Sequence, residues 1–281
     1  MHTPIQPLIT LLVICLLTLA SHPARSGDNP GADELANYAF ANYLGTGIYS
    51  VAGRAVQVYR LPIAVNLREE TPDRLGYKLR LPLTLGFFDF KAEDLIDEGL
   101  PDDVATVTFV PGLEAVYTAL PGWEIKPFVD FGLARNLSGG EDAYLYGLGA
   151  RHQYRFRWRR QDWTYGNALY FAGNRGVDSG AVDNFGAFET GLAWDLPWYV
   201  RVGKRRWAAN VYLANYVYLG DLELVRTSLD PVTVDTLWEV GTTIGTRRVL
   251  RLWFIDMPRV GIGVRFGDDF SALRIVLGMP F

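Results

Sequence analysis

The chain has 281 residues, of which 49% are hydrophobic and 14% aromatic, and its formal net charge is −4 at pH 7. A nearly neutral chain lacks the broad basic footprint of a nucleic-acid-binding protein, so we expect no nucleic-acid partner. After the N-terminal region, no stretch approaches the roughly 20 consecutive apolar residues of a membrane helix. The length suits a single all-β domain.

The one long apolar run, PLITLLVICLLTLA (7–20), predicts the hydrophobic part of a cleaved export signal. We expect the signal to be residues 1–26, with cleavage after Ser26 preferred over cleavage after Ala20. An uncleaved N-terminal anchor is the alternative. The residue before Cys15 is not small, which argues against lipidation. Cys15 is the only cysteine, so the exported protein would have none, which is compatible with the Gram-negative envelope.

Residues 27–41 (GDNPGADELANYAFA) differ in pattern from the rest of the chain. An acidic start with proline and glycine is followed by apolar residues at roughly helical spacing. The pattern is typical of a short helix, over about 31–42, in front of the main domain. A disordered leader is the alternative.

Alternation of apolar and polar residues dominates from residue 42 onward and predicts strands. In YKLRLPLTLGFF (77–88), Tyr, Leu and Phe line one face, while the other face is mainly Lys, Arg, Pro, Thr and Gly. The stretches YRLPIAVNLR (59–68) and WEIKPFVDFGLA (123–134) follow the same rule. The apolar rows begin or end with aromatic residues, as the interfacial girdles of membrane barrels do. The strands also exceed the usual ~5–6 residues of globular proteins.

An open sheet edge does not survive in lipid, so membrane-crossing strands must close into a barrel with a polar interior. The fold class expected for residues 42–281 is therefore all-β, a closed antiparallel transmembrane β-barrel of about 12 strands. The expected strands are 43–52, 54–68, 75–88, 104–118, 123–135, 143–156, 161–172, 184–195, 206–219, 234–246, 258–267 and 270–281.

The expected connections are longer on one side of the membrane than on the other. The loops opposite the termini are 89–103, 136–142, 173–183 and 220–233, and short turns on the terminal side are 69–74, 119–122 and 157–160. Two longer connections, PWYVRVGKRR (197–206) and RRVLRLWFIDM (247–257), mix basic and apolar residues. We expect them to lie in the membrane interface as amphipathic segments. Alternatively, one of them is an extra strand, which raises the count to fourteen or shifts the register.

Charged residues of both signs fall on the face that alternates with the apolar one. The candidate lumen charges are Arg60, Arg68, Lys78, Arg80, Glu114, Glu124, Lys126, Asp130, Arg151, Glu189, Glu239 and Arg274, and the same parity holds for Arg155, Arg259, Arg265 and Asp235. Buried charges need partners, so the mixture predicts a salt-bridge network that fills a narrow interior. The alternative is a small channel whose arginine-rich wall, near Arg60 and Arg80, guides an anionic solute.

The chain ends on LRIVLGMPF, where apolar residues alternate up to a terminal aromatic. This ending resembles the C-terminal sorting signal of Gram-negative outer-membrane β-barrels. The residues that carry the resemblance are Leu273, Ile275, Leu277, Met279 and Phe281. It implies that these residues face lipid and are recognised by the barrel-assembly machinery, that periplasmic chaperones are partners, and that lipid and lipopolysaccharide surround the barrel. Pro280 departs from the pattern, because it removes one backbone donor.

A helix before the first strand, about twelve strands, and a barrel that fills the chain after the signal also resemble the β-domain of autotransporters. The form resembled is the solitary autotransporter-like β-barrel, which lacks a passenger domain. The resemblance implies a structural or weakly pore-forming outer-membrane barrel. The alternative is a small porin-like channel for anionic solutes, and a barrel enzyme with an unrecognised motif is a third hypothesis.

The sequence contains none of the motifs that we considered from the known enzymes of outer-membrane barrels. Lipases and lipid A deacylases of the outer membrane resemble each other in a His-x-Ser nucleophile motif. After cleavage at Ser26 the one remaining histidine is His152, which is followed by Gln153 and Tyr154 and has the parity of the lipid face. The acidic pairs 102–103 and 268–269 lack the Asp–His partner of omptin-type proteases. The sequence therefore predicts no enzyme, no metal and no cofactor.

Overall fold

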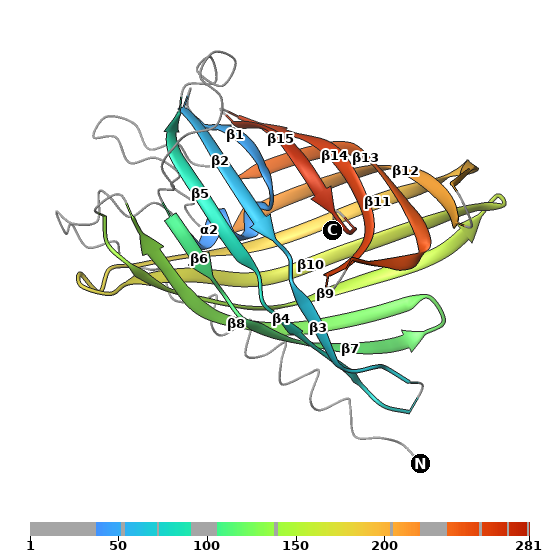
Figure 1. The fold of residues 1–281 in the computed structure, drawn as a ribbon, viewed down its shortest axis with the longest axis horizontal. Helices are drawn as coiled ribbons and strands as arrows, with labels where there is room; N and C mark the ends of the chain where they lie inside the picture. Colours follow the sequence, from blue (N-terminus) through green and yellow to red (C-terminus); the bar gives the residue numbers. More distant parts are fainter. Residues whose placement is uncertain are drawn as a thin grey trace.

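A computed structural model describes residues 38–51, 54–71, 73–90, 106–137, 140–202, 205–219, 235–252, 255–268, 270–279 and 281. The elements are α2 (Tyr38–Leu44), β1 (Gly47–Val51), β2 (Arg54–Leu61), β3 (Ala64–Arg68), β4 (Gly76–Arg80), β5 (Leu83–Phe90), β6 (Thr106–Phe109), β7 (Gly112–Leu120), β8 (Trp123–Asn136), β9 (Ala143–Trp158), β10 (Gln161–Gly176), β11 (Val182–Val202), β12 (Arg205–Leu219), β13 (Thr236–Leu252), β14 (Ile255–Gly267) and β15 (Phe270–Leu277). They form a closed antiparallel β-barrel of 12 wall strands with one short helix, as expected (Figure 1).

Three of the wall strands are each interrupted by a short break that contains a proline. The breaks separate β2 from β3 at Pro62, β4 from β5 at Pro82, and β6 from β7 at Pro111. Proline has no N–H and cannot donate to a neighbouring strand. Ala64 pairs with Arg80, and the same register extended by two residues places Pro62 opposite Pro82. We call Pro62, Pro82 and Pro111 the proline row.

The ring closes through two pairings. β1 pairs with β15, with Gly47 opposite Arg274, so the first and last wall strands are neighbours. β8 pairs with β9 from Trp123 opposite Tyr154 to Ala134 opposite Ala143. These pairings leave the barrel without an open seam between its first and last strands.

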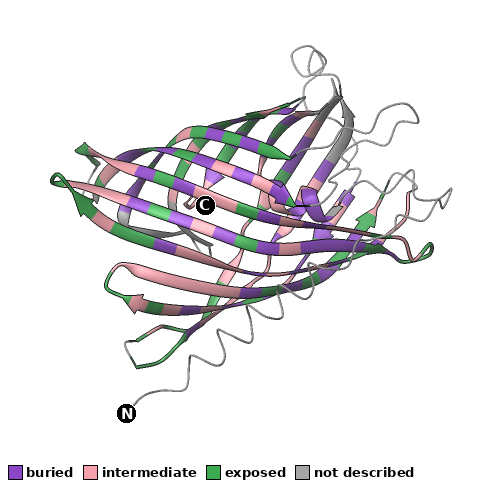
Figure 2. Cartoon of the chain, turned by 180° about the vertical axis from the view of Figure 1, so that it is seen from behind, coloured by how far each residue is buried: buried purple, intermediate pink, exposed green. Residues whose placement is uncertain are grey.

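Burial alternates along the strands and separates an outer face from an inner face (Figure 2). In β8, Val129, Phe131 and Leu133 are exposed on the outer face, whereas Phe128 and Asp130 are buried on the inner face. The barrel is thus apolar outside and carries its charges inside. That arrangement inverts the usual plan of a soluble protein and is typical of membrane barrels.

The two segments expected as amphipathic connections are extensions of paired strands instead, so the expectation that they lie outside the strands was wrong. Their place at the membrane interface stays a prediction. β11 continues to Val202, which pairs with Arg205 of β12, and Leu250 of β13 pairs with Met257 of β14. A register shift precedes each extension, after Asp195 and after Gly245. Such an irregularity breaks strict alternation and hid the strands from the sequence pattern. The extra-strand alternative is also wrong, because the barrel has 12 strands.

The structure describes the helix expected over about 31–42 only from Tyr38, where α2 is helical and ends later than expected, at Leu44. Residues 31–37 lie outside the described residues. The expected signal (1–26), most of the expected loops 89–103 and 220–233, and Asp102, Asp103 and Asp269 lie outside the described residues.

The loop between β10 and β11 is held by one carboxylate. Glu141 Oε1 accepts hydrogen bonds from the backbone N–H groups of Asp178 and Ser179, both at 2.5 Å. Its Oε2 accepts from Ser179 Oγ at 2.7 Å. Partial desolvation raises the pKa of Glu141, but these hydrogen bonds outweigh it and hold the pKa below the usual value.

Because the pKa of Glu141 is lowered in the folded protein, the loop should be stabilised at neutral pH and loosen as the pH falls through that lowered pKa. We expect hydrogen-exchange protection of the Asp178 and Ser179 amides, corrected for intrinsic exchange rates, to fall in this acidic range. Glu141→Gln should show weak protection at every pH and no acidic step. An acidic step of the same size in Glu141→Gln would contradict this assignment.

Candidate functional site

The barrel interior is the candidate functional site, and α2 lies within it (Figure 1). The ring of Phe40 packs edge-on against Tyr218 at 5.3 Å and Phe185 at 5.9 Å between centroids. Tyr43 stacks on Tyr170 at 4.8 Å. These aromatic partners come from β10, β11 and β12, so α2 is fixed to the inner wall on several strands.

An ion-pair cluster joins α2 to the wall on the side of β4, β7, β8 and β9. Tyr43 Oη donates to Asp130 Oδ2 at 3.0 Å, and Arg80 Nη2 donates to Asp130 Oδ1 at 2.5 Å. Arg151 Nη1 donates to Glu114 Oε2 at 3.3 Å, and Arg80 Nη1 lies 3.9 Å from the same oxygen. The candidate charges Arg80, Glu114, Asp130 and Arg151 are thus brought together.

This cluster carries a surplus of positive charge. The guanidinium groups of Arg80 and Arg151 both lie over the ring of Phe128, at 4.5 and 4.2 Å. Arg60 is close enough to interact electrostatically with Arg80 and Arg151. Among the described residues, no carboxylate lies within ion-pair distance of Arg60, and its Nε is buried without a hydrogen bond. We call Arg60, Arg80 and Arg151 the arginine cluster.

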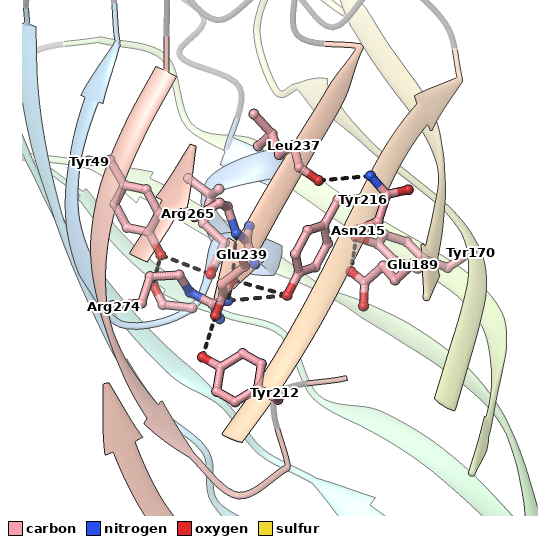
Figure 3. Close-up of polar contacts among 12 residues, drawn as sticks. Tyr49, Tyr170, Glu189, Tyr212, Asn215, Tyr216, Leu237, Glu239, Arg265 and Arg274 are labelled. Carbon is pink, nitrogen blue, oxygen red and sulfur yellow. Dashed lines mark hydrogen bonds and ion pairs between the residues drawn. The ribbon is translucent and has the colours of Figure 1, made fainter. Parts of the chain in front are cut away.

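A second cluster surrounds Glu239 on the opposite wall (Figure 3). Its Oε2 accepts from Arg265 Nε at 2.8 Å, from Arg274 Nη1, and from Tyr216 Oη at 3.1 Å. Its Oε1 accepts from Tyr212 Oη at 2.7 Å. Glu239 is 0% exposed and Arg265 is 2% exposed, so both charges depend on these partners rather than on water. We call this set the Glu239 cluster.

The Glu239 cluster is continuous with the C-terminal end of α2. Tyr49, which lies beside Arg274 in Figure 3, donates from Oη to the carbonyl oxygens of Leu44 at 2.8 Å and Gly45 at 3.0 Å. The last carbonyls of a helix have no partner within it, so this hydroxyl satisfies groups that would otherwise be orphaned. Both charged clusters therefore hold α2 in the interior.

Among the described residues, the other candidate charges form no ion pair with these two clusters. Glu124 pairs with Lys126 at 2.6 Å and with Arg155 at 3.2 Å. Glu189 accepts from Tyr170 Oη at 2.8 Å. The remaining candidates are Arg68, which donates to Leu75 O and lies over Tyr77; Lys78, opposite Glu114 in register; Arg259, which pairs with Asp195; and Asp235, which is exposed.

Sequence reasoning missed the tyrosines of the interior. Tyr212 and Tyr216 hold Glu239, and Tyr43 holds Asp130. The stretch NVYLANYVYL (210–219) places its tyrosines at alternate positions, so the same parity rule would have assigned them to the inner face. Nothing in the sequence pattern pointed to Tyr43, because its partner depends on where α2 lies in the barrel.

The C-terminal segment departs from the expected row of lipid-facing residues. Leu273 and Ile275 are exposed on the outer face, but Gly278 adopts a φ of 100°, a conformation that favours glycine. Beyond this turn, Met279 and Phe281 pack against the core, and the ring of Phe281 lies 6.5 Å from that of Tyr212. The lipid-facing assignment of Met279 and Phe281 was therefore wrong. Their role in assembly stays a prediction, because a sorting signal is recognised before the barrel has formed.

His152 lies on the outer face between the rings of Trp123 and Tyr165. In the part of the chain that the structure describes, no group of three or more His, Cys, Asp or Glu residues could hold a metal ion. No helix among the described residues is long and apolar enough to cross a membrane. The chain matches no protein-family model, and no curated protein is significantly similar to it.

Proposed function

We propose that the chain is an integral outer-membrane β-barrel of solitary autotransporter-like type, structural or weakly pore-forming. The observation that carries the proposal is α2, which lies inside a 12-strand barrel and is anchored by Phe40 and Tyr43. The apolar outer face and the charged interior support a location in a membrane. The ending of the chain supports the outer membrane, by its resemblance to the sorting signal.

A small channel for anionic solutes is the second candidate function. It is favoured by the arginine cluster, where three guanidinium groups face the two carboxylates of Glu114 and Asp130. A net positive wall in a narrow interior attracts anions and repels cations. Under this second proposal, α2 limits the current rather than abolishing it.

Planar-bilayer conductance tests both proposals with the refolded full chain. Phe40→Ala/Tyr43→Ala removes the aromatic anchors of α2, so we expect conductance severalfold above wild type. Phe131→Ala, on the outer face, is the matched control and should conduct as wild type does. An unchanged conductance in the double variant would contradict a helix that occludes the pore. If the open variant prefers anions and Arg60→Gln removes the preference, the channel proposal is supported.

A further inference from the structure

Four polar side chains form a continuous row on the largely apolar outer face. His152 pairs in register with Asn167, Asn167 with Thr190, and Thr190 with Asn215, across β9, β10, β11 and β12. Asn167 and Asn215 each lie two positions along the strand from an exposed leucine, Leu169 and Leu213, so the row points away from the lumen. On β14, the corresponding outward residues are Val260, Ile262, Val264 and Phe266. We call His152, Asn167, Thr190 and Asn215 the polar row.

The polar row is only partly satisfied within the chain. Asn167 Nδ2 donates to Thr190 Oγ1 at 2.9 Å and to Tyr165 Oη at 3.0 Å, and Asn215 Nδ2 donates to Leu237 O at 3.2 Å. Within the described residues, His152 Nδ1 is buried without a partner, and nothing donates to Oδ1 of Asn167 or Asn215. Hydrocarbon cannot supply these bonds, and an unpaired polar group in it is costly.

A groove opens beside the β9 end of the polar row. It has a volume of about 470 Å³ and is bounded by Trp123, Ile125, Leu169 and Phe188. His152, Asn167 and the small residue Ala150 also line it. The outer wall therefore offers both a recess for a bulky apolar side chain and polar groups beside it.

We propose that this face binds a second copy of the chain in the membrane. The inference rests on the proposed membrane location, because only in lipid do the polar groups lack water as a partner. A lipid chain can fill the groove but cannot hydrogen-bond along a row that spans four strands, roughly 14 Å at the usual strand spacing. Asn, Thr and His each donate and accept, so the row is complementary to itself.

The symmetry of insertion fits this occupant. Two copies enter the membrane in the same orientation, so a two-fold axis along the membrane normal brings the same face of each together. Exposed rings at the groove, such as Phe188, then have a recess on the opposite copy. Hydrogen bonds in membranes contribute modestly, so the packing of these apolar residues supplies most of the affinity.

Disulfide trapping tests the proposal in lipid nanodiscs, with the full chain carrying Cys15→Ser. Leu169→Cys places a thiol at the groove. Ile275→Cys is the control, because Ile275 lies away from the groove and is exposed to a similar extent: Leu169 is 44% exposed and Ile275 is 49% exposed. We expect an intermolecular disulfide for Leu169→Cys and little for Ile275→Cys. Equal trapping of the two would overturn the proposed face.

The dissociation constant of the dimer, measured in detergent by sedimentation, gives a second test. Asn167→Leu should raise this dissociation constant by about tenfold, because each copy loses the hydrogen bond that Asn167 would make to the other copy. Heat-modifiable migration on a denaturing gel is recorded for every variant. A wild type without heat-modifiable migration would overturn the membrane proposal itself, whereas a heat-modifiable monomer would overturn only the dimer. If the purified wild type retains a bound lipid and the His152→Leu variant does not, the groove binds lipid, and the dimer proposal is overturned as well.

Discussion

Glu239→Ala should lower the free energy of unfolding by about 3–5 kcal/mol, the cost of removing one partner from a buried ion pair. The substitution leaves Arg265 and Arg274 buried with no carboxylate between them. It also removes the acceptor of the hydroxyl groups of Tyr212 and Tyr216. Because Glu239 is 0% exposed, water cannot take its place without opening the interior.

Urea unfolding of the barrel in lipid vesicles, followed by tryptophan fluorescence, measures this loss. Glu124→Ala is the matched control, because Glu124 also pairs with two cations but has a side chain that is 23% exposed. We expect the control to cost less than about 1 kcal/mol. Equal losses in the two variants would mean that the Glu239 cluster is hydrated, which would contradict its structural role.

Phe281→Ala should reduce assembly into the outer membrane severalfold, whereas Gly191→Ala should not. Both substitutions disturb the contact that Phe281 makes inside the barrel. A Cβ at position 191 would lie 2.2 Å from Cδ1 of Phe281 and would displace its ring. Only Phe281→Ala changes the C-terminal signal that the resemblance assigns to the assembly machinery.

The yield of heat-modifiable barrel in cells, relative to total chain, measures assembly in both variants. A reduced yield of both variants would show that assembly depends on the contact of Phe281 inside the barrel rather than on the C-terminal signal. Normal assembly of Phe281→Ala would contradict a signal read at the terminal aromatic. Urea unfolding separates these cases from a loss of stability, because both variants are expected to be destabilised once folded.

The barrel was predictable because the alternation of side chains along a strand continues across the short breaks at the prolines. Each break of the proline row contains two residues, so Tyr59 and Val65 remain on the same face across Pro62. The extensions after Asp195 and Gly245 were not predictable, because each begins with a register shift that inserts unpaired residues into the strand. After Gly245 the shift is an odd number of residues, which moves the later side chains to the other face. The turn at Gly278 has the same effect on Met279 and Phe281.

The charged interior was predictable residue by residue, but its pairing was not. Parity assigns Glu239 and Arg274 to the inner face, and nothing in the spacing shows that they meet from strands that are not neighbours. Which charges meet depends on the stagger of the strands and on the place of α2. The same holds for Asp130, whose partner Tyr43 comes from the helix.

The proline row divides the wall into two parts that are joined by few backbone bonds. On its short-turn side, β3 pairs with β4 and β4 pairs with β7, and Leu81 N donates to Ile63 O between the two breaks at 2.8 Å. Each proline removes a donor at this level. The corner formed by β3 and β4 is therefore bonded to the rest of the wall mainly through β7, and a local fluctuation of this corner would reach α2 through Arg80 and its bond to Asp130.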